Sequence, residues 1–310
     1  MRFASVWVDG APHLALMEAD HAFLFAPLAR RAARAGTGRG LRRGRGDVPD
    51  DVLSFIEQGS MAQARTALAL GRRLLRAGRA GDLVLPLSRI RVLAPIPRPR
   101  KNIFCLGRNY AEHARERSES VPGVPIFFTK PPTAVVGPDD PVIRHAVTEQ
   151  LDYEVELAVI IGRRGRDIPV ERALDYVFGY TILNDISARD LQARHVQWFK
   201  GKSLDTFAPL GPVVTHRSAI PDPQNLRIRL RVNGELRQDA STGSMIFPVA
   251  QVIAVLSAGM TLEPGDILAT GTPEGVGAGR TPPAWLQPGD VVEAEIEGVG
   301  VLRNRIVGPR

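Results

Sequence analysis

The chain has 310 residues, of which 44% are hydrophobic and 24% charged, and its 40 basic and 33 acidic side chains give a formal net charge of +7. This composition is that of an ordinary globular protein with a large buried core. No apolar run approaches the roughly 20 residues of a membrane span, the N-terminus lacks a secretion signal, and the lone Cys105 excludes an internal disulfide or a thiolate metal cluster. We therefore expect a cytoplasmic protein that does not contact membranes.

The first 90 residues are predicted to form a small α/β domain. Residues 3–8 form a strand-like run, and residues 35–50 are rich in Gly and Arg and predict a loop. Helical spacing of apolar residues follows from Asp51 to Arg79, with a possible break at Gly59. Four prolines between residues 86 and 99 then indicate a linker. We place a boundary near residue 90, so the second domain covers residues 91–310.

Arginines cluster in two runs of this first domain, which raises the possibility of a nucleic-acid site. No aromatic residues are interleaved with either run, and no nucleic-acid motif lies near them. The runs therefore predict a solvated helix face and a basic loop, and we expect the charge to attract small anions instead of nucleic acid. The arginines concerned are Arg30, Arg31, Arg34, Arg39, Arg42, Arg43 and Arg45, then Arg72, Arg73, Arg76 and Arg79.

The second domain is dominated by short strand-like runs with turn signals between them, which favours a β-rich α+β fold of sandwich or barrel type. Helical stretches are few. The predicted strands are residues 102–106, 151–161, 176–183, 226–232, 267–269 and 291–296, and the predicted helices are residues 111–117, 187–195 and 249–257.

Two glutamates lie inside the most apolar of these strands. Side chains alternate along a strand, so Glu154 and Glu156 project from the same face of residues 151–161. Buried carboxylates that close repel one another, and a bound cation such as Mg²⁺ or Mn²⁺ would relieve the repulsion. An exposed face with both carboxylates in water is an equally good interpretation of the pattern alone.

A second polar cluster follows the strand at residues 176–183. Asp185 stands at its end, and Ser187 with Asp190 matches a capping box that would start a helix at Ser187. Arg189 and Gln192 would then share one face of this helix. An ordinary acidic helix start explains the same residues without a ligand.

Three further segments carry candidate groups. His113 and Glu116 are three residues apart on a predicted helix, where a carboxylate can orient an imidazole as a general base, although such surface pairs are common. Lys202 is one of only four lysines in the chain, and Gly201 before it could bring it close to a ligand. Two solvated lysines on a surface loop, Lys200 and Lys202, explain the segment equally well. The glycine-rich residues 270–277 are not followed by a helix, which argues against a phosphate-binding loop.

Together and in order, these motifs resemble the fumarylacetoacetate hydrolase family, from about residue 100 to the C-terminus. The matching segments are GRNYAEH, FFTKPPTAVVGP, DYEVELAVIIG, GYTILNDISARDLQ, GKSLDTFAPLGP, VNGELRQDAS and LEPGDILATGTPEGVG. The long variant of the family that carries the segment GKSLDTF is similar to bacterial hydroxyheptadienedioate isomerases and diketo-acid hydrolases. The resemblance implies a mixed β-sandwich roll, a homodimer and a role in the breakdown of aromatic compounds.

The resemblance also implies roles for individual residues. Three carboxylates would hold Mg²⁺ or Mn²⁺, a lysine would lie beside the substrate, three residues would contact substrate oxygens, and a dyad would activate water. The residues concerned are Glu154, Glu156 and Asp185 for the metal, Lys202 beside the substrate, Arg189, Gln192 and Thr272 for substrate oxygens, and His113 with Glu116 for the dyad.

These roles predict a hydrolase that cleaves a C–C bond of a small anionic diketo acid, such as an acylpyruvate or fumarylpyruvate, through a metal-stabilised enolate. The same site could instead isomerise or decarboxylate a hydroxymuconate-like diacid, or act on oxaloacetate as a decarboxylase or tautomerase. A basic binding module without activity is the third hypothesis.

Overall fold

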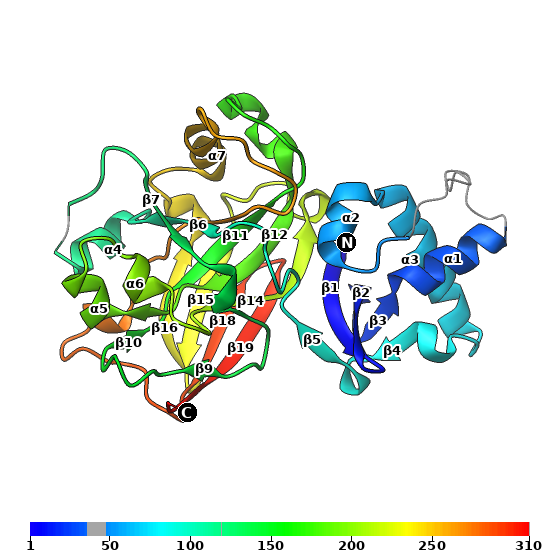
Figure 1. Ribbon diagram of the computed structural model, residues 1–310, viewed down its shortest axis with the longest axis horizontal. Coiled ribbons are helices and arrows are strands. Elements are labelled where there is room, and N and C mark those ends of the chain that lie inside the picture. The colour runs from blue at the N-terminus through cyan, green and yellow to red at the C-terminus, as the bar shows by residue number, and fades with distance from the viewer. Residues whose placement is uncertain (36–47, 119, 310) are drawn as a thin grey trace.

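The computed structural model describes residues 1–35, 48–118 and 120–309, and it shows a strand-rich α+β fold, as predicted. Figure 1 shows two lobes, one formed mainly by the N-terminal strands and helices and a larger one formed by the rest of the chain. Most of the predicted basic loop, with Arg39, Arg42, Arg43 and Arg45, lies outside the described residues. None of the helices in the described ranges is both long and apolar enough to cross a membrane.

In the described part of the N-terminal lobe, four strands join three α-helices, and aromatic and aliphatic side chains form the core between them. The predicted break at Gly59 is confirmed, because one helix ends at Gln58 and the next begins at Met61. Ser60 and Gln63 then start the next helix with a capping box. The elements are β1 (Arg2–Val8), β2 (Ala11–Glu18), β3 (His21–Leu24), β4 (Val84–Pro86), α1 (Phe25–Arg34), α2 (Val52–Gln58) and α3 (Met61–Arg76).

One long sheet runs through both lobes in the order β4-β3-β2-β1-β14-β12-β11-β17-β6-β7. The lobes meet where β1 pairs with β14, with Phe3 opposite Val214. The boundary near residue 90 stays a prediction, and this pairing shows that the two sides share one sheet. The strands new here are β14 (Ala208–His216), β12 (Val177–Asn184), β11 (Val155–Ile161), β17 (Ile267–Ala269), β6 (Ile103–Gly107) and β7 (Ile126–Lys130), with β5 (Arg91–Leu93) on β1 and β8 (Val135–Val136) on β14.

A second sheet packs on β11 and β12, so the sandwich alternative is the correct one. A large apolar core that includes Leu157, Ile182, Leu230 and Ala294 lies between the two sheets. Its strands are β16 (Glu235–Ser241), β15 (Arg227–Val232), β18 (Val291–Ile296), β19 (Gly300–Val307) and β9 (Val142–Ile143). The remaining elements are the pair β10 (Leu151–Asp152) and β13 (Ser187–Ala188), with α4 (Ala111–Glu116), α5 (Arg189–Arg194), α6 (Phe199–Lys202) and α7 (Val249–Ser257).

Two local predictions were wrong. Residues 151–161 form two strands, because the Asp152 side chain accepts a hydrogen bond from the Tyr153 N–H and β10 leaves the main sheet to pair with β13. Ser187 belongs to β13 and does not cap a helix, since its hydroxyl donates to the Asp185 carbonyl. The helix begins at Arg189 instead.

Candidate active site

Three buried carboxylates meet where β11 begins and β12 ends. The two strands are antiparallel neighbours with Val155 opposite Asn184, so Glu154 and Glu156 at the start of β11 lie beside Asp185. One oxygen from each carboxylate can be chosen so that all three lie within 4.8 Å of one another. Glu154 is 4% and Glu156 1% exposed, which rules out the alternative of a solvated strand face.

Two lysines neutralise part of this negative charge. Lys202 Nζ donates to Glu154 Oε2 at 2.7 Å and to Asp185 Oδ2 at 2.8 Å. Burial alone would lower the pKa of Lys202, but Asp185 and Glu154 outweigh burial and raise it. Lys130, which the sequence analysis did not assign, is fully buried and donates to Asp185 Oδ1 at 2.5 Å. Burial lowers its pKa.

Glu156 lacks such a counterion among the described residues. Its Oε2 accepts a hydrogen bond from the Gly271 N–H at 2.8 Å. Burial, reinforced by Asp185 and Glu154, raises the pKa of this carboxyl well above its usual value. A hard divalent cation such as Mg²⁺ or Mn²⁺ fits this set, because the available donors are carboxylate oxygens and their repulsion is only partly compensated.

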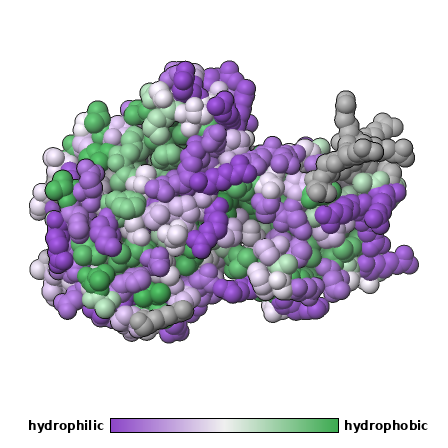
Figure 2. All heavy atoms as spheres, in the orientation of Figure 1, coloured by the Kyte–Doolittle hydropathy of each residue, from purple (hydrophilic) through white to green (hydrophobic). Residues whose placement is uncertain are grey.

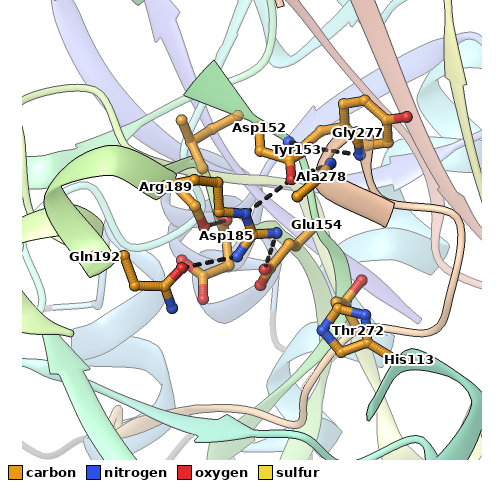
Figure 3. Close-up of polar contacts among 12 residues, drawn as sticks. His113, Asp152, Tyr153, Glu154, Asp185, Arg189, Gln192, Thr272, Gly277 and Ala278 are labelled. Carbon is orange, nitrogen blue, oxygen red and sulfur yellow. Dashed lines mark hydrogen bonds and ion pairs between the residues drawn. The ribbon is translucent and has the colours of Figure 1, made fainter. Parts of the chain in front are cut away.

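Arg189 contacts the Glu154 oxygen that Lys202 leaves free, and its three nitrogens make two hydrogen bonds and one ion pair (Figure 3). Its Nε donates to Asp152 Oδ2 at 2.8 Å, Nη1 donates to Gln192 Oε1 at 3.0 Å, and Nη2 lies 2.6 Å from Glu154 Oε1. Burial opposes the charge, but Glu154 and Asp152 raise the pKa of Arg189. Lys202 and Arg189 in turn lower the pKa of Glu154 against the effect of burial.

The predicted dyad forms on α4. His113 Nδ1 lies 2.8 Å from Glu116 Oε1, and the other oxygen of Glu116 accepts a hydrogen bond from the Gly275 N–H at 2.8 Å. His113 is 8% exposed and lines the same pocket as the glutamates. Thr272 is placed on the pocket wall, where its hydroxyl donates to the Val155 carbonyl at 2.9 Å.

The pocket is small, with about 30 Å³ of space for water, and seven of its thirteen lining residues were predicted from the sequence. The predicted Glu116 and Asp185 contact lining residues but do not line the pocket themselves. The sequence analysis missed its aromatic wall, in which Arg108 lies over the Trp198 ring and Phe128 meets that ring edge-on. Gly107 is required there, because a Cβ would lie 2.2 Å from Trp198. The lining residues are Leu106, Gly107, Arg108, His113, Arg117, Phe128, Glu154, Glu156, Arg189, Gln192, Trp198, Lys202 and Thr272.

Asp152 was also missed, although the sequence contained a signal for it. It precedes Glu154 by two residues, as Glu154 precedes Glu156, and it is fully buried. Cys105 also lies close to the site but is buried in β6, where burial raises the pKa of its thiol well above the usual value and disfavours the reactive thiolate.

Comparisons with known proteins identify the relatives of this chain. The fumarylacetoacetate (FAA) hydrolase C-terminal family model matches residues 102–307. Oxaloacetate tautomerase YisK of Bacillus subtilis is 49% identical over 264 residues, which cover 84% of this chain and 87% of that protein. The solved structure of a fumarylacetoacetate hydrolase from Exiguobacterium antarcticum matches over the full length of both chains, with 42% identity and a TM-score of 0.81. A structure of 5-carboxymethyl-2-hydroxymuconate delta-isomerase from Mycobacterium smegmatis matches 99% of this chain and 100% of its own, with 30% identity and a TM-score of 0.72.

These relatives correct one prediction. The sequence analysis favoured a hydrolase of C–C bonds, but the curated relatives in Bacillus subtilis, rat and human are all named oxaloacetate tautomerases. A carboxylate cluster with a nearby base serves enolate chemistry in general, so the motifs alone did not separate hydrolysis from proton transfer. The hydrolase assignment is therefore wrong. The matched family model covers two thirds of the sequence and includes every candidate site residue, and the chain belongs to the fumarylacetoacetate hydrolase family.

Proposed function

We propose that this protein interconverts the keto and enol forms of a short dicarboxylic 2-oxo acid of the oxaloacetate type, with Mg²⁺ or Mn²⁺ as cofactor. The observation that carries the proposal is the 49% identity to an oxaloacetate tautomerase across 84% of the chain. The site geometry supports it, because a base, a buried ammonium group and a carboxylate cluster surround one pocket.

Tautomerisation needs a base for the C3 proton and positive charge near the oxygen at C2. His113 Nε2 would take the proton from C3, while Glu116 holds the ring through Nδ1. The electrons of the broken C–H bond then form the C2–C3 double bond, and the oxygen at C2 takes up a proton from His113 or from solvent. No water is added and no C–C bond breaks.

The cationic side chains would bind and orient the acid. Lys202 keeps its proton, since its pKa is raised, so it would act as a hydrogen-bond donor to the enolate oxygen. Arg189 would bind a substrate carboxylate beside Gln192. A divalent cation held by Glu154, Glu156 and Asp185 would supply further positive charge to polarise the keto group.

The test follows the ultraviolet absorbance of the enol of oxaloacetate as it relaxes to the keto form, with Mg²⁺ and after chelation. His113→Gln should lower kcat by about 100-fold or more, because it removes the base. His195→Gln is the matched control, since His195 directly follows α5, is exposed and does not line the pocket. Unchanged turnover in His113→Gln would contradict the proposal.

A second candidate is isomerisation of a hydroxymuconate-like diacid, which the similarity to the Mycobacterium smegmatis isomerase favours. This reaction also moves a proton through an enolate, but it shifts a carbon–carbon double bond. Proton NMR of the products from both substrates distinguishes the two, and release of CO₂ would identify decarboxylation. The homodimer, the small anionic substrate and the absence of nucleic-acid and membrane partners stay predictions, as does the role in the breakdown of aromatic compounds.

A further inference from the structure

The glycine-rich loop that follows β17 donates backbone N–H groups to three carboxylates around the pocket. Gly271 donates to Glu156, a proposed metal ligand, and Gly275 donates to Glu116, which holds the proposed base. The third carboxylate, Asp152, has no part in that reaction and is fully buried at the end of β10.

The Asp152 carboxylate accepts four hydrogen bonds, which uses the whole accepting capacity of its two oxygens. Oδ1 accepts from the Gly277 N–H at 2.7 Å and the Tyr153 N–H at 2.9 Å. Oδ2 accepts from the Ala278 N–H at 3.0 Å and from Arg189 Nε at 2.8 Å. Figure 3 shows this carboxylate between the loop and the guanidinium group.

The bond to Nε determines how the guanidinium group of Arg189 lies. A guanidinium group is planar, so an anchor at Nε together with the partners of Nη1 and Nη2 defines its plane. A long side chain that is already held in place loses little conformational freedom when a ligand binds to it. The edge of Arg189 that carries Nη1 and Nη2 faces Gln192 and Glu154, which both line the pocket.

Capping the loop does not by itself require a full negative charge at position 152. The N–H groups of Tyr153, Gly277 and Ala278 are neutral donors, so they carry no charge that the Asp152 carboxylate would have to balance. Among the described residues, Arg189 is the one charged partner of Asp152. The buried charge is therefore matched to the guanidinium group.

We propose that Asp152 is a positioning residue, which holds Arg189 in the orientation that binds a substrate carboxylate and ties that orientation to the glycine-rich loop. This inference rests on the proposed function in one respect, since it takes Arg189 as a substrate contact.

The experiment is a double-mutant cycle between Asp152→Asn and Arg189→Gln, with Mg²⁺ present. It measures kcat and KM for oxaloacetate and, separately, the Kd of oxalate by calorimetry, because oxalate mimics a carboxylate with an adjacent oxo group and does not react. We expect Asp152→Asn to raise KM and Kd about 10-fold with little change in kcat, as loss of a charge-assisted contact predicts. In the Arg189→Gln background the same change should add less than about 2-fold.

Asp266→Asn is the matched control. Asp266 is also a buried aspartate that pairs with a cation, Lys101 at 2.9 Å, but it does not line the pocket. Its replacement should leave KM and Kd unchanged. If Asp152→Asn does not fold, Asp152→Glu replaces it in the cycle, since it keeps the charge and moves the carboxylate by one methylene.

Three outcomes would overturn the inference. The first is a double variant whose fold-change in Kd equals the product of the two single fold-changes. The others are an unchanged Kd in Asp152→Asn and an unchanged Kd in Arg189→Gln. The oxalate measurement separates it from the proposed function. If the wild type does not turn over oxaloacetate but oxalate binding follows the expected cycle, the proposed function fails and the role of Asp152 stands.

Discussion

The N-terminal lobe and the carboxylate site both contain ion pairs, but the pairs differ in how far solvent reaches them. In the lobe, Arg72 on α3 pairs with Glu18 on β2, and the two side chains are 51% and 40% exposed. In the site, the side chains of Lys202 and Glu154 are 3% and 6% exposed. Water therefore screens the first pair and hardly reaches the second.

The difference shows which charges the fold depends on. An exposed pair contributes at most about 1 kcal/mol, because both ions are well solvated when they separate. A buried ion whose partner is removed costs several kcal/mol, because neither water nor another charge replaces that partner. The predictions below test this contrast, in order of decreasing effect.

Removal of Lys202 should have the largest effect. Lys202→Met leaves Glu154 and Asp185 buried without their shared ammonium group, so we expect the free energy of unfolding of the metal-free protein to fall by about 3 to 5 kcal/mol. Activity should also be lost. Urea titration measures the change, and added Mg²⁺ should recover more stability in the variant than in the wild type. Equal Mg²⁺ effects in both proteins would contradict the proposed metal site.

Neutralising Glu156 should have the opposite effect on stability. Its folded-state pKa is raised, so the metal-free protein loses stability as pH increases above the usual value of 4.5 toward the folded-state pKa. Glu156→Gln removes this loss and should raise the free energy of unfolding at pH 7 by about 1 to 2 kcal/mol. Activity at limiting Mg²⁺ should fall about 100-fold, because a metal ligand is lost. Lower stability of the metal-free variant at pH 7 would refute this interpretation.

His216 tests the border between the two lobes. It ends β14, where its backbone N–H donates to the Met1 carbonyl, and burial with help from the N-terminal amino group lowers its pKa to about 4. The unfolded chain then binds a proton near pH 6.5 that the folded protein does not, so stability should fall as pH decreases from 6.5 to 4. Urea titrations at pH 7 and pH 5 should show a smaller loss in His216→Asn. An identical loss in both proteins would exclude His216 as its cause.

Breaking the exposed pair should have the smallest effect. Arg72→Gln should reduce the free energy of unfolding by less than about 1 kcal/mol and leave oxaloacetate turnover unchanged. The difference from the wild type should shrink further in 1 M NaCl, where exposed charges are screened. A loss as large as that of Lys202→Met would remove the contrast between the two regions.

Local patterns predicted much of the fold. The helix that ends near Arg76, the break at Gly59 and the strand at residues 291–296 follow from residues adjacent in the chain. The start of α5 could not be predicted this way, because Ser187 in β13 pairs with Asp152 of β10, which lies 35 residues earlier in the chain. Tertiary pairing decided between a cap and a strand, and the sequence around Ser187 allowed both.

The candidate site divides in the same way. His113 and Glu116 meet because they are one helical turn apart, so their spacing alone predicted the contact. Lys130 reaches Asp185 across 55 residues of sequence, and only the order of the strands in the sheet brings them together. Residue types identified which groups could react. The contacts of Lys130 with Asp185 and of Asp152 with Arg189 depend instead on how the strands are arranged.

The pairing of β1 with β14 has a consequence for the design of shorter versions of this protein. Without residues 1–90, the half of β14 near Val214 and Thr215 would become an unprotected edge strand with free N–H and C=O groups. Such an edge is a template for another chain, so a truncated protein would be prone to self-association even if every site residue were intact. The N-terminal lobe therefore serves as a built-in protection against aggregation for the sheet that carries the carboxylates.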